Sequence, residues 1–185
     1  MKKEHTELRR RPLLTPVWLT AIAGVVLVAV AAWFIVSLAT TTVVVVRHAE
    51  KELGTIEDPP LSQAGEQRAQ LLARMFGERD GRVRIDAIIV SDTRRAQRTA
   101  APLADRLGIA VTTVEAKDYD RLLSQIRAHR GGRVLIVGHS NTVPEIVHRL
   151  AGGDEVPPIA DGDYSQLYIV TMPTLGPASV LRMRY

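Results

Sequence analysis

The chain has 185 residues, of which 46% are hydrophobic and 24% charged, and it contains no cysteine. This composition is typical of one globular domain with an appendage, and a chain without cysteine has no disulfides, zinc–thiolate sites or thiol catalysis. The formal net charge of +4 comes mainly from residues 1–16, which hold five basic and two acidic side chains, so nucleic acid is not expected as a partner of the nearly neutral remainder.

The first predicted element is an apolar segment over residues 16–39. No charged residue occurs from position 12 to position 46. As a helix that rises about 1.5 Å per residue, the segment would reach roughly 36 Å, which exceeds a hydrocarbon core of about 30 Å. Trp18 and Trp33 lie toward its two ends, where membrane interfaces favour indole rings. The sequence therefore predicts a single-pass transmembrane helix that acts as a signal anchor.

Two alternatives to the anchor remain. The sequence Ser37-Leu38-Ala39 resembles the cleavage site of a secretory signal, although the apolar run is longer than the usual signal core of about 7–15 residues. A buried core helix is the other alternative, and it is disfavoured because the segment is apolar on every face.

The distribution of basic residues predicts the topology. Residues 1–15 contain the cluster of lysines and arginines, and the positive-inside rule keeps such a tail in the cytoplasm. The domain expected over residues 40–185 would then be extracytoplasmic and close to the bilayer. If the helix is cleaved, the domain would instead be secreted or periplasmic.

Beyond the apolar segment, strand and helix patterns alternate. Residues 41–46 read TTVVVV, a β-branched run that is typical of a strand buried on both faces. In chain order the predictions are strand 41–46, helix 61–76, strand 85–90, helix 95–107, strand 110–114, helix 118–130, strand 133–137, helix 142–150, and strands 165–171 and 180–184. This alternation predicts an α/β fold with a mostly parallel sheet.

Basic side chains follow three of these strands. Arg47 and His48 follow the first, Arg95 follows the second, and His139 follows the fourth. Ligands of such sheets bind at the carboxyl ends of the strands, so we expect these side chains to meet. Arginine forks suit a phosphate dianion, and an uncharged histidine can attack phosphorus. Each residue alone is weak evidence, but together they favour a phosphate monoester as the ligand.

Four segments resemble the histidine phosphatase (phosphoglycerate mutase-like) superfamily, and they occur in the order found in that family. They read VVVVRHAEK (43–51), DPPLSQAGEQRAQLLA (58–73), SDTRRAQRTAAPLA (91–104) and VLIVGHSNTVPEIV (134–147). Ala49 stands where the family usually has glycine. The resemblance implies a three-layer α/β/α sandwich around a mixed sheet with one antiparallel strand near the end.

The resemblance also implies roles for individual residues. His48 would be the nucleophile that accepts the phosphoryl group. Arg47 and Arg95 would bind the phosphate, and His139 would stabilise the transferring group. Two further residues are expected to line the pocket: Ser140 and Asn141.

The general acid is left open by the sequence. Many family members place a carboxylate after the third strand, where this chain has Glu115 and Asp118, but the surrounding residues do not match the family motif. Glu50 and Asp58 are alternatives because they lie nearer to His48 in the sequence. A substrate with a good leaving group would need no acid.

The expected activity is two-step hydrolysis of a phosphate monoester or phosphoramidate through a phosphohistidine. No carboxylate cluster that could hold a metal pair is evident, so neither a metal nor a cofactor is expected. Candidate substrates are a phosphorylated small molecule, an envelope glycan, a lipid head group and a phosphoprotein. The chain leaves little room for a lid, which disfavours a mutase. The alternative is a non-catalytic, membrane-anchored module that binds phosphorylated ligands.

Overall fold

The computed structural model describes residues 17–37, 40–54, 57–78, 84–153 and 156–185. The chain divides into two compact units, and the division falls after Ser37. The predicted basic tail at residues 1–15 lies outside the described residues, as do Leu38 and Ala39 of the possible cleavage site.

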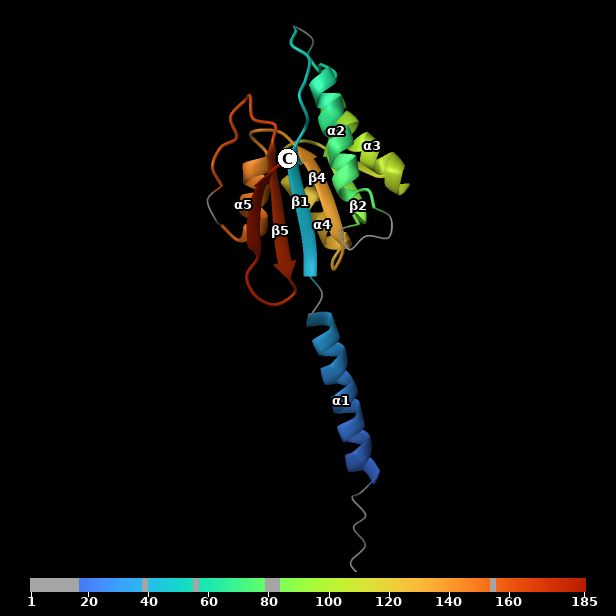
Figure 1. Cartoon of the computed structure of the whole chain (residues 1–185). Helices are drawn as coiled ribbons and strands as arrows, with labels where there is room; N and C mark the ends of the chain where they lie inside the picture. Colours follow the sequence, from blue (N-terminus) through green and yellow to red (C-terminus); the bar gives the residue numbers. More distant parts are fainter. Residues whose placement is uncertain (1–16, 38–39, 55–56, 79–83, 154–155) are drawn as a thin grey trace, which may run out of the picture. The chain divides into compact units, whose positions relative to one another are not determined.

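The described residues of the first unit, 17–37, form the helix α1 (Val17–Ser37) (Figure 1). Residues Trp18–Ile35 have a mean hydropathy of 2.3, and none of them is buried. The helix is thus long and apolar enough to cross a membrane, and a signal sequence near the N-terminus would meet the same criterion. Its bounds agree with the segment predicted at residues 16–39.

The second unit is built around one six-stranded sheet. Its elements are β1 (Thr40–Arg47), α2 (Gln63–Phe76), β2 (Ala87–Ser91), α3 (Arg94–Leu107), β3 (Val111–Val114), α4 (Tyr119–Ala128), β4 (Arg133–Gly138), α5 (Val143–Ala151), β5 (Gln166–Pro173) and β6 (Ser179–Arg184). The strand order is β3-β2-β4-β1-β5-β6. Strands β1 to β4 pair in parallel, and β5 runs antiparallel to both of its neighbours. The predicted fold class is therefore confirmed, including the single reversed strand.

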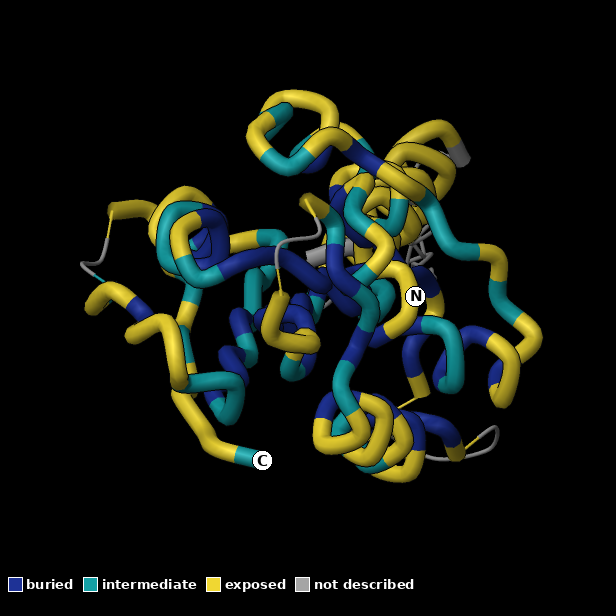
Figure 2. The backbone as a smooth tube through the Cα atoms, turned by 90° about the horizontal axis from the view of Figure 1, so that it is seen from above, coloured by how far each residue is buried: buried dark blue, intermediate teal, exposed yellow. Residues whose placement is uncertain are grey.

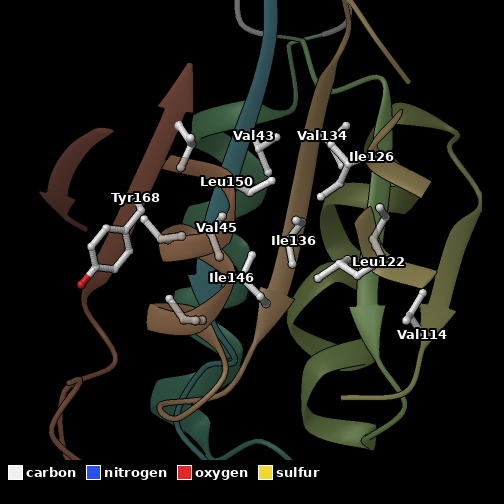
Figure 3. Close-up of a cluster of buried hydrophobic side chains, with 14 of the residues drawn as sticks. Val43, Val45, Val114, Leu122, Ile126, Val134, Ile136, Ile146, Leu150 and Tyr168 are labelled. Atoms are coloured by element: carbon white, nitrogen blue, oxygen red, sulfur yellow. The ribbon is translucent and has the colours of Figure 1, made fainter. Parts of the chain in front are cut away.

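Helices cover both faces of the sheet, which explains the run of valines in β1. Val44 and Val46 pack in one core with residues of α2 and α3. Val43 and Val45 point to the opposite face and pack with α4 and α5 (Figure 3). Successive side chains of a strand alternate between the faces, so a strand between two helical layers needs apolar residues at every position. Figure 2 shows the buried strands between helices whose outer sides are exposed.

Polar side chains define where several helices begin. The Ser62 hydroxyl accepts a hydrogen bond from the Gly65 N–H and caps α2. Asp118 was predicted as the first residue of its helix, but it lies one position earlier and caps α4 by accepting from the Arg121 N–H. Helix α3 continues through Pro102 to Leu107. These two caps fix the ends of the loops that follow β1 and β3.

Candidate active site

His48 lies directly after β1 and is almost completely buried. Its backbone N–H donates to the Gly138 carbonyl over 2.8 Å, which extends the pairing between β1 and β4 by one residue. Its Nδ1 lies 2.8 Å from the Ala49 carbonyl oxygen. A carbonyl can only accept a hydrogen bond, so this contact places the ring proton on Nδ1 and leaves the lone pair on Nε2.

Arg95, in the first turn of α3, joins the two histidines. Its Nε donates to His48 Nε2 over 3.2 Å, and its Nη2 lies 3.5 Å from His139 Nδ1. The centroids of the two imidazole rings are 5.2 Å apart. Residues that follow β1, β2 and β4 therefore meet around one guanidinium group.

Arg47 is the last residue of β1, and the loop before β5 binds its guanidinium group. Its Nη1 donates to the carbonyl oxygens of Ala160 and Asp163 over 2.9 and 3.2 Å. Its guanidinium carbon lies 4.1 Å from the centroid of the Tyr164 ring. Its Nε is buried and has no partner among the described residues, which leaves one donor for a bound anion. The sequence analysis missed this loop because it carries no periodicity and no recognised motif.

Burial sets the protonation state of both histidines. Desolvation, helped by the positive charges of Arg95 and Arg47, lowers the pKa of His48 to about 3. Desolvation and Arg95 lower the pKa of His139 to about 4. Both rings are therefore neutral at neutral pH, and Nε2 of His48 has the lone pair that nucleophilic attack requires.

A buried threonine holds the loop of His48 against α3. The Ala49 N–H donates to the Thr99 hydroxyl over 2.9 Å, and that hydroxyl donates to the Arg95 carbonyl over 2.7 Å. Thr99 is fully buried. One hydroxyl thus links the segment after the nucleophile to the turn that carries Arg95. Thr99 lies within the motif segment at residues 91–104, but its role was not predicted.

A second buried threonine positions His139. The Thr142 hydroxyl accepts from the His139 N–H over 2.9 Å. A Cβ atom on Gly138 would lie 2.9 Å from this hydroxyl oxygen. The glycine that ends β4 therefore makes room for the contact.

Two of the carboxylates proposed as the general acid are engaged elsewhere. Burial alone would raise the pKa of Glu50, but hydrogen bonds from Arg68, 2.7–2.9 Å long, lower it below its ordinary value. Asp58 accepts from Arg95 Nη1 over 3.1 Å and from the Arg94 N–H over 2.8 Å. Asp58 therefore holds Arg95 of the site, whereas Glu50 is paired with Arg68 of α2.

The other two predicted carboxylates do not line the pocket of His48. Glu115 is exposed and lines a separate, small pocket, and Asp118 caps α4. Among the described residues that line the His48 pocket, the only carboxylate is that of Asp161, which the sequence analysis did not single out.

The remaining lining residues come from several loops. Ser140 and Asn141, which follow His139, are among the residues that line the pocket. Lys51 and Lys117 also line it, and neither was predicted. The described residues contain no group of three histidine, aspartate or glutamate side chains placed to hold a metal ion.

Comparisons with known proteins identify relatives of the second unit. The model of the histidine phosphatase superfamily (branch 1) matches residues 43–118, which include three of the four predicted catalytic residues. No match among curated protein sequences was found.

Several solved structures share the fold. The protein histidine phosphatase SixA, complexed with tungstate, has a TM-score of 0.64 and 22% identity, with coverage of 77% of this chain and 96% of its own. A SixA-type protein from Agrobacterium tumefaciens has a TM-score of 0.58 at 19% identity, covering 78% and 98% of the two chains. A mycobacterial glucosyl-3-phosphoglycerate phosphatase has a TM-score of 0.55 at 17% identity, covering 71% and 90%.

Proposed function

Because the model of the histidine phosphatase superfamily matches residues 43–118, we propose that this chain is a member that hydrolyses a phosphate monoester or phosphoramidate through a phosphohistidine on His48. The observation that carries the proposal is the neutral Nε2 atom of His48, 3.2 Å from Arg95 Nε and facing the ring of His139. A nucleophile with an unprotonated Nε2 thus lies beside donors for the phosphoryl oxygens.

In the first step, His48 Nε2 attacks phosphorus. The P–N bond forms while the bond to the leaving oxygen or nitrogen breaks, and the leaving atom takes the electron pair. His48 becomes a cationic phosphoimidazole, since Nδ1 keeps its proton. The Ala49 carbonyl, 2.8 Å from Nδ1, favours this charged form. Arg47, Arg95 and His139 hold the equatorial oxygens, where most of the catalysis of phosphoryl transfer arises.

In the second step, water attacks the same phosphorus atom. The P–O bond forms, the P–N bond breaks, and His48 Nε2 recovers its lone pair. Water loses one proton in this step, and the leaving group gains one in the first step. Asp161 is the carboxylate that lines the pocket, and we assign it to this proton exchange. The group would act as an acid first and as a base second.

The substrate class follows from the relatives only in broad terms. The SixA relatives are named for phosphohistidine, and the mycobacterial relative is named for a phosphorylated glycoside. The proposal therefore includes four kinds of substrate: a phosphorylated small molecule, an envelope glycan, a lipid head group and a phosphoprotein. Metal independence is also part of it, so excess chelator is expected to leave the rate unchanged.

Catalysis is tested with the full chain in detergent. Wild type, His48→Ala and His139→Ala would be offered 4-nitrophenyl phosphate. We expect turnover by the wild type and a loss of at least about 1000-fold in the His48 variant. If all three proteins release phosphate equally, or if none does while each still binds inorganic phosphate, the non-catalytic binding module replaces the enzyme.

We further propose that α1 is an uncleaved anchor with a cytoplasmic N-terminus and an extracytoplasmic second unit. The support is its length, its mean hydropathy of 2.3 and the basic residues that precede it. A reporter that is active only outside the cytoplasm, fused after Tyr185, should be active. Activity of a cytoplasm-specific reporter at the same position would reverse the topology, and a shortened mature protein would indicate cleavage.

A further inference from the structure

The two lysines that follow the apolar segment both line the pocket of His48. The sequence contains four lysines, and Lys2 and Lys3 precede the predicted anchor. The other two are Lys51 and Lys117, and both are exposed lining residues of this one pocket. Every other permanent positive charge on a side chain in residues 17–185 is that of an arginine.

The two lysines flank the phosphoryl site from different parts of the sheet. Lys51 follows β1, and Lys117 follows β3. In the strand order these two strands are separated by β2 and β4, which corresponds to roughly 14 Å at the usual strand spacing. The residues that follow β2 and β4, Arg95 and His139, lie between them. The lysines therefore belong to the rim of the pocket, outside the groups that hold phosphate.

The pocket wall carries more cations than the two arginines that are proposed to hold the phosphoryl group. The permanent cations are those of Arg47, Arg95 and the two lysines. Asp161 also lines the wall, and Asp58 is paired with Arg95 over 3.1 Å. In the proposed reaction, Arg47, which is buried, and Arg95, which is partly buried, hold the phosphoryl dianion. The two lysines then keep their charge at the mouth, where the leaving part of a substrate must lie.

We propose that the natural substrate carries a second anionic group, a carboxylate or another phosphate, on the part that leaves, and that Lys51 and Lys117 bind it. This inference rests on the proposed phosphatase function and narrows its substrate class. Lysine suits the task because its ammonium group is a compact charge on a flexible stem, which can follow an anion whose position differs among substrates. A planar arginine fork suits the fixed oxygens of the transferred group instead.

The test compares two substrates that differ in one charge. These are 4-carboxyphenyl phosphate and its neutral amide, 4-carbamoylphenyl phosphate, offered to the full chain in detergent. The wild type is expected to have a kcat/KM at least about tenfold higher for the carboxylate, and the preference should shrink as salt is raised. The Lys51→Gln/Lys117→Gln variant should lose most of the preference. Arg98→Gln, which removes an exposed cation from α3, should retain it.

A readout without turnover separates this inference from the catalytic proposal. An amine-acylating reagent would label Lys51 and Lys117, and labelling would be measured with the phosphonate analogues of both substrates. Protection by the carboxylate analogue alone supports the anion site even if no phosphate is released, in which case only the catalytic proposal fails. Turnover with equal kcat/KM for both substrates overturns the anion site and leaves the phosphatase intact. Equal protection by both analogues also overturns it.

Discussion

Nε of Arg95 donates a hydrogen bond to Nε2 of His48 over 3.2 Å. The atom proposed to attack phosphorus is therefore already occupied by the side chain that is proposed to bind the phosphate. In the proposed reaction, a bound phosphate would displace this contact and accept from Arg95 in place of the ring.

Replacing Arg95 by lysine should retain the positive charge but lose the arrangement of hydrogen-bond donors that the guanidinium group provides. A single ammonium group cannot contact His48, His139 and Asp58 together, as the guanidinium does. We expect kcat/KM for an aryl phosphate to fall by about 100- to 1000-fold without loss of the folded state. Arg98→Lys, on the exposed side of the same helix, is the matched control. Equal activity of the two variants would remove Arg95 from the site.

Asp161→Asn should lower kcat/KM by an amount that depends on the leaving group of the substrate. An alkyl phosphate needs a proton on its departing oxygen, so kcat/KM is expected to fall by about 100-fold or more. A 4-nitrophenyl leaving group is stable as an anion and should be affected much less. Asp118→Asn is the comparison, because that carboxylate caps α4 instead of lining the pocket. A similar loss for both substrates would mean that Asp161 does not handle the proton.

Thr99→Val should weaken both the fold and the catalytic geometry. The change leaves the buried Ala49 N–H without its acceptor and removes the bond to the Arg95 carbonyl. Leaving such a group unpaired costs about 1–3 kcal/mol of the free energy of unfolding, which urea denaturation would measure. Thr99→Ser keeps the hydroxyl and should lose clearly less. If the two variants are equally stable, the lost methyl packing matters more than the hydrogen bonds.

The buried histidines predict how stability depends on pH. The folded state lowers the pKa of His48 to about 3 and that of His139 to about 4, below the ordinary value of about 6.5. At pH values between the folded and the ordinary pKa, the unfolded chain therefore binds more protons than the folded chain does. Stability is complete above about pH 6.5 and falls as the pH drops, by up to about 2 kcal/mol for each histidine between pH 7 and pH 5.

The matching measurement is urea denaturation of wild type, His48→Asn and His139→Asn at pH 7 and pH 5. Each variant should lose less stability on acidification than the wild type does. The carboxylates titrate in all three proteins, so the difference isolates the histidine. An identical loss in wild type and variants would show that these rings are not held neutral by burial.

The sequence predicted the strands and the helices, and it placed four basic side chains after neighbouring strands. Alternating strands and helices fix the layers, and the parallel strands bring Arg47, His48, Arg95 and His139 to one edge. Their roles remain predictions, although Arg95 contacts both histidines.

Contacts between distant segments could not be predicted in this way. Asp161 and Tyr164 lie in a loop without periodicity, and only folding brings it onto Arg47. Likewise, sequence proximity to His48 made Glu50 a candidate acid, but it is paired with Arg68 from the helix that follows. Nothing in the sequence specifies that pairing.

The most direct measurement is the detection of phosphate on His48 itself. The wild type would be mixed rapidly with a phosphorylated substrate, quenched in base and analysed by peptide mass spectrometry under conditions that preserve phosphoramidates. We predict one phosphoryl group on the peptide that contains His48, labile in acid, and none in His48→Ala. Substrate turnover with His48 unmodified at every time, or with phosphate on another residue, would contradict the proposed mechanism.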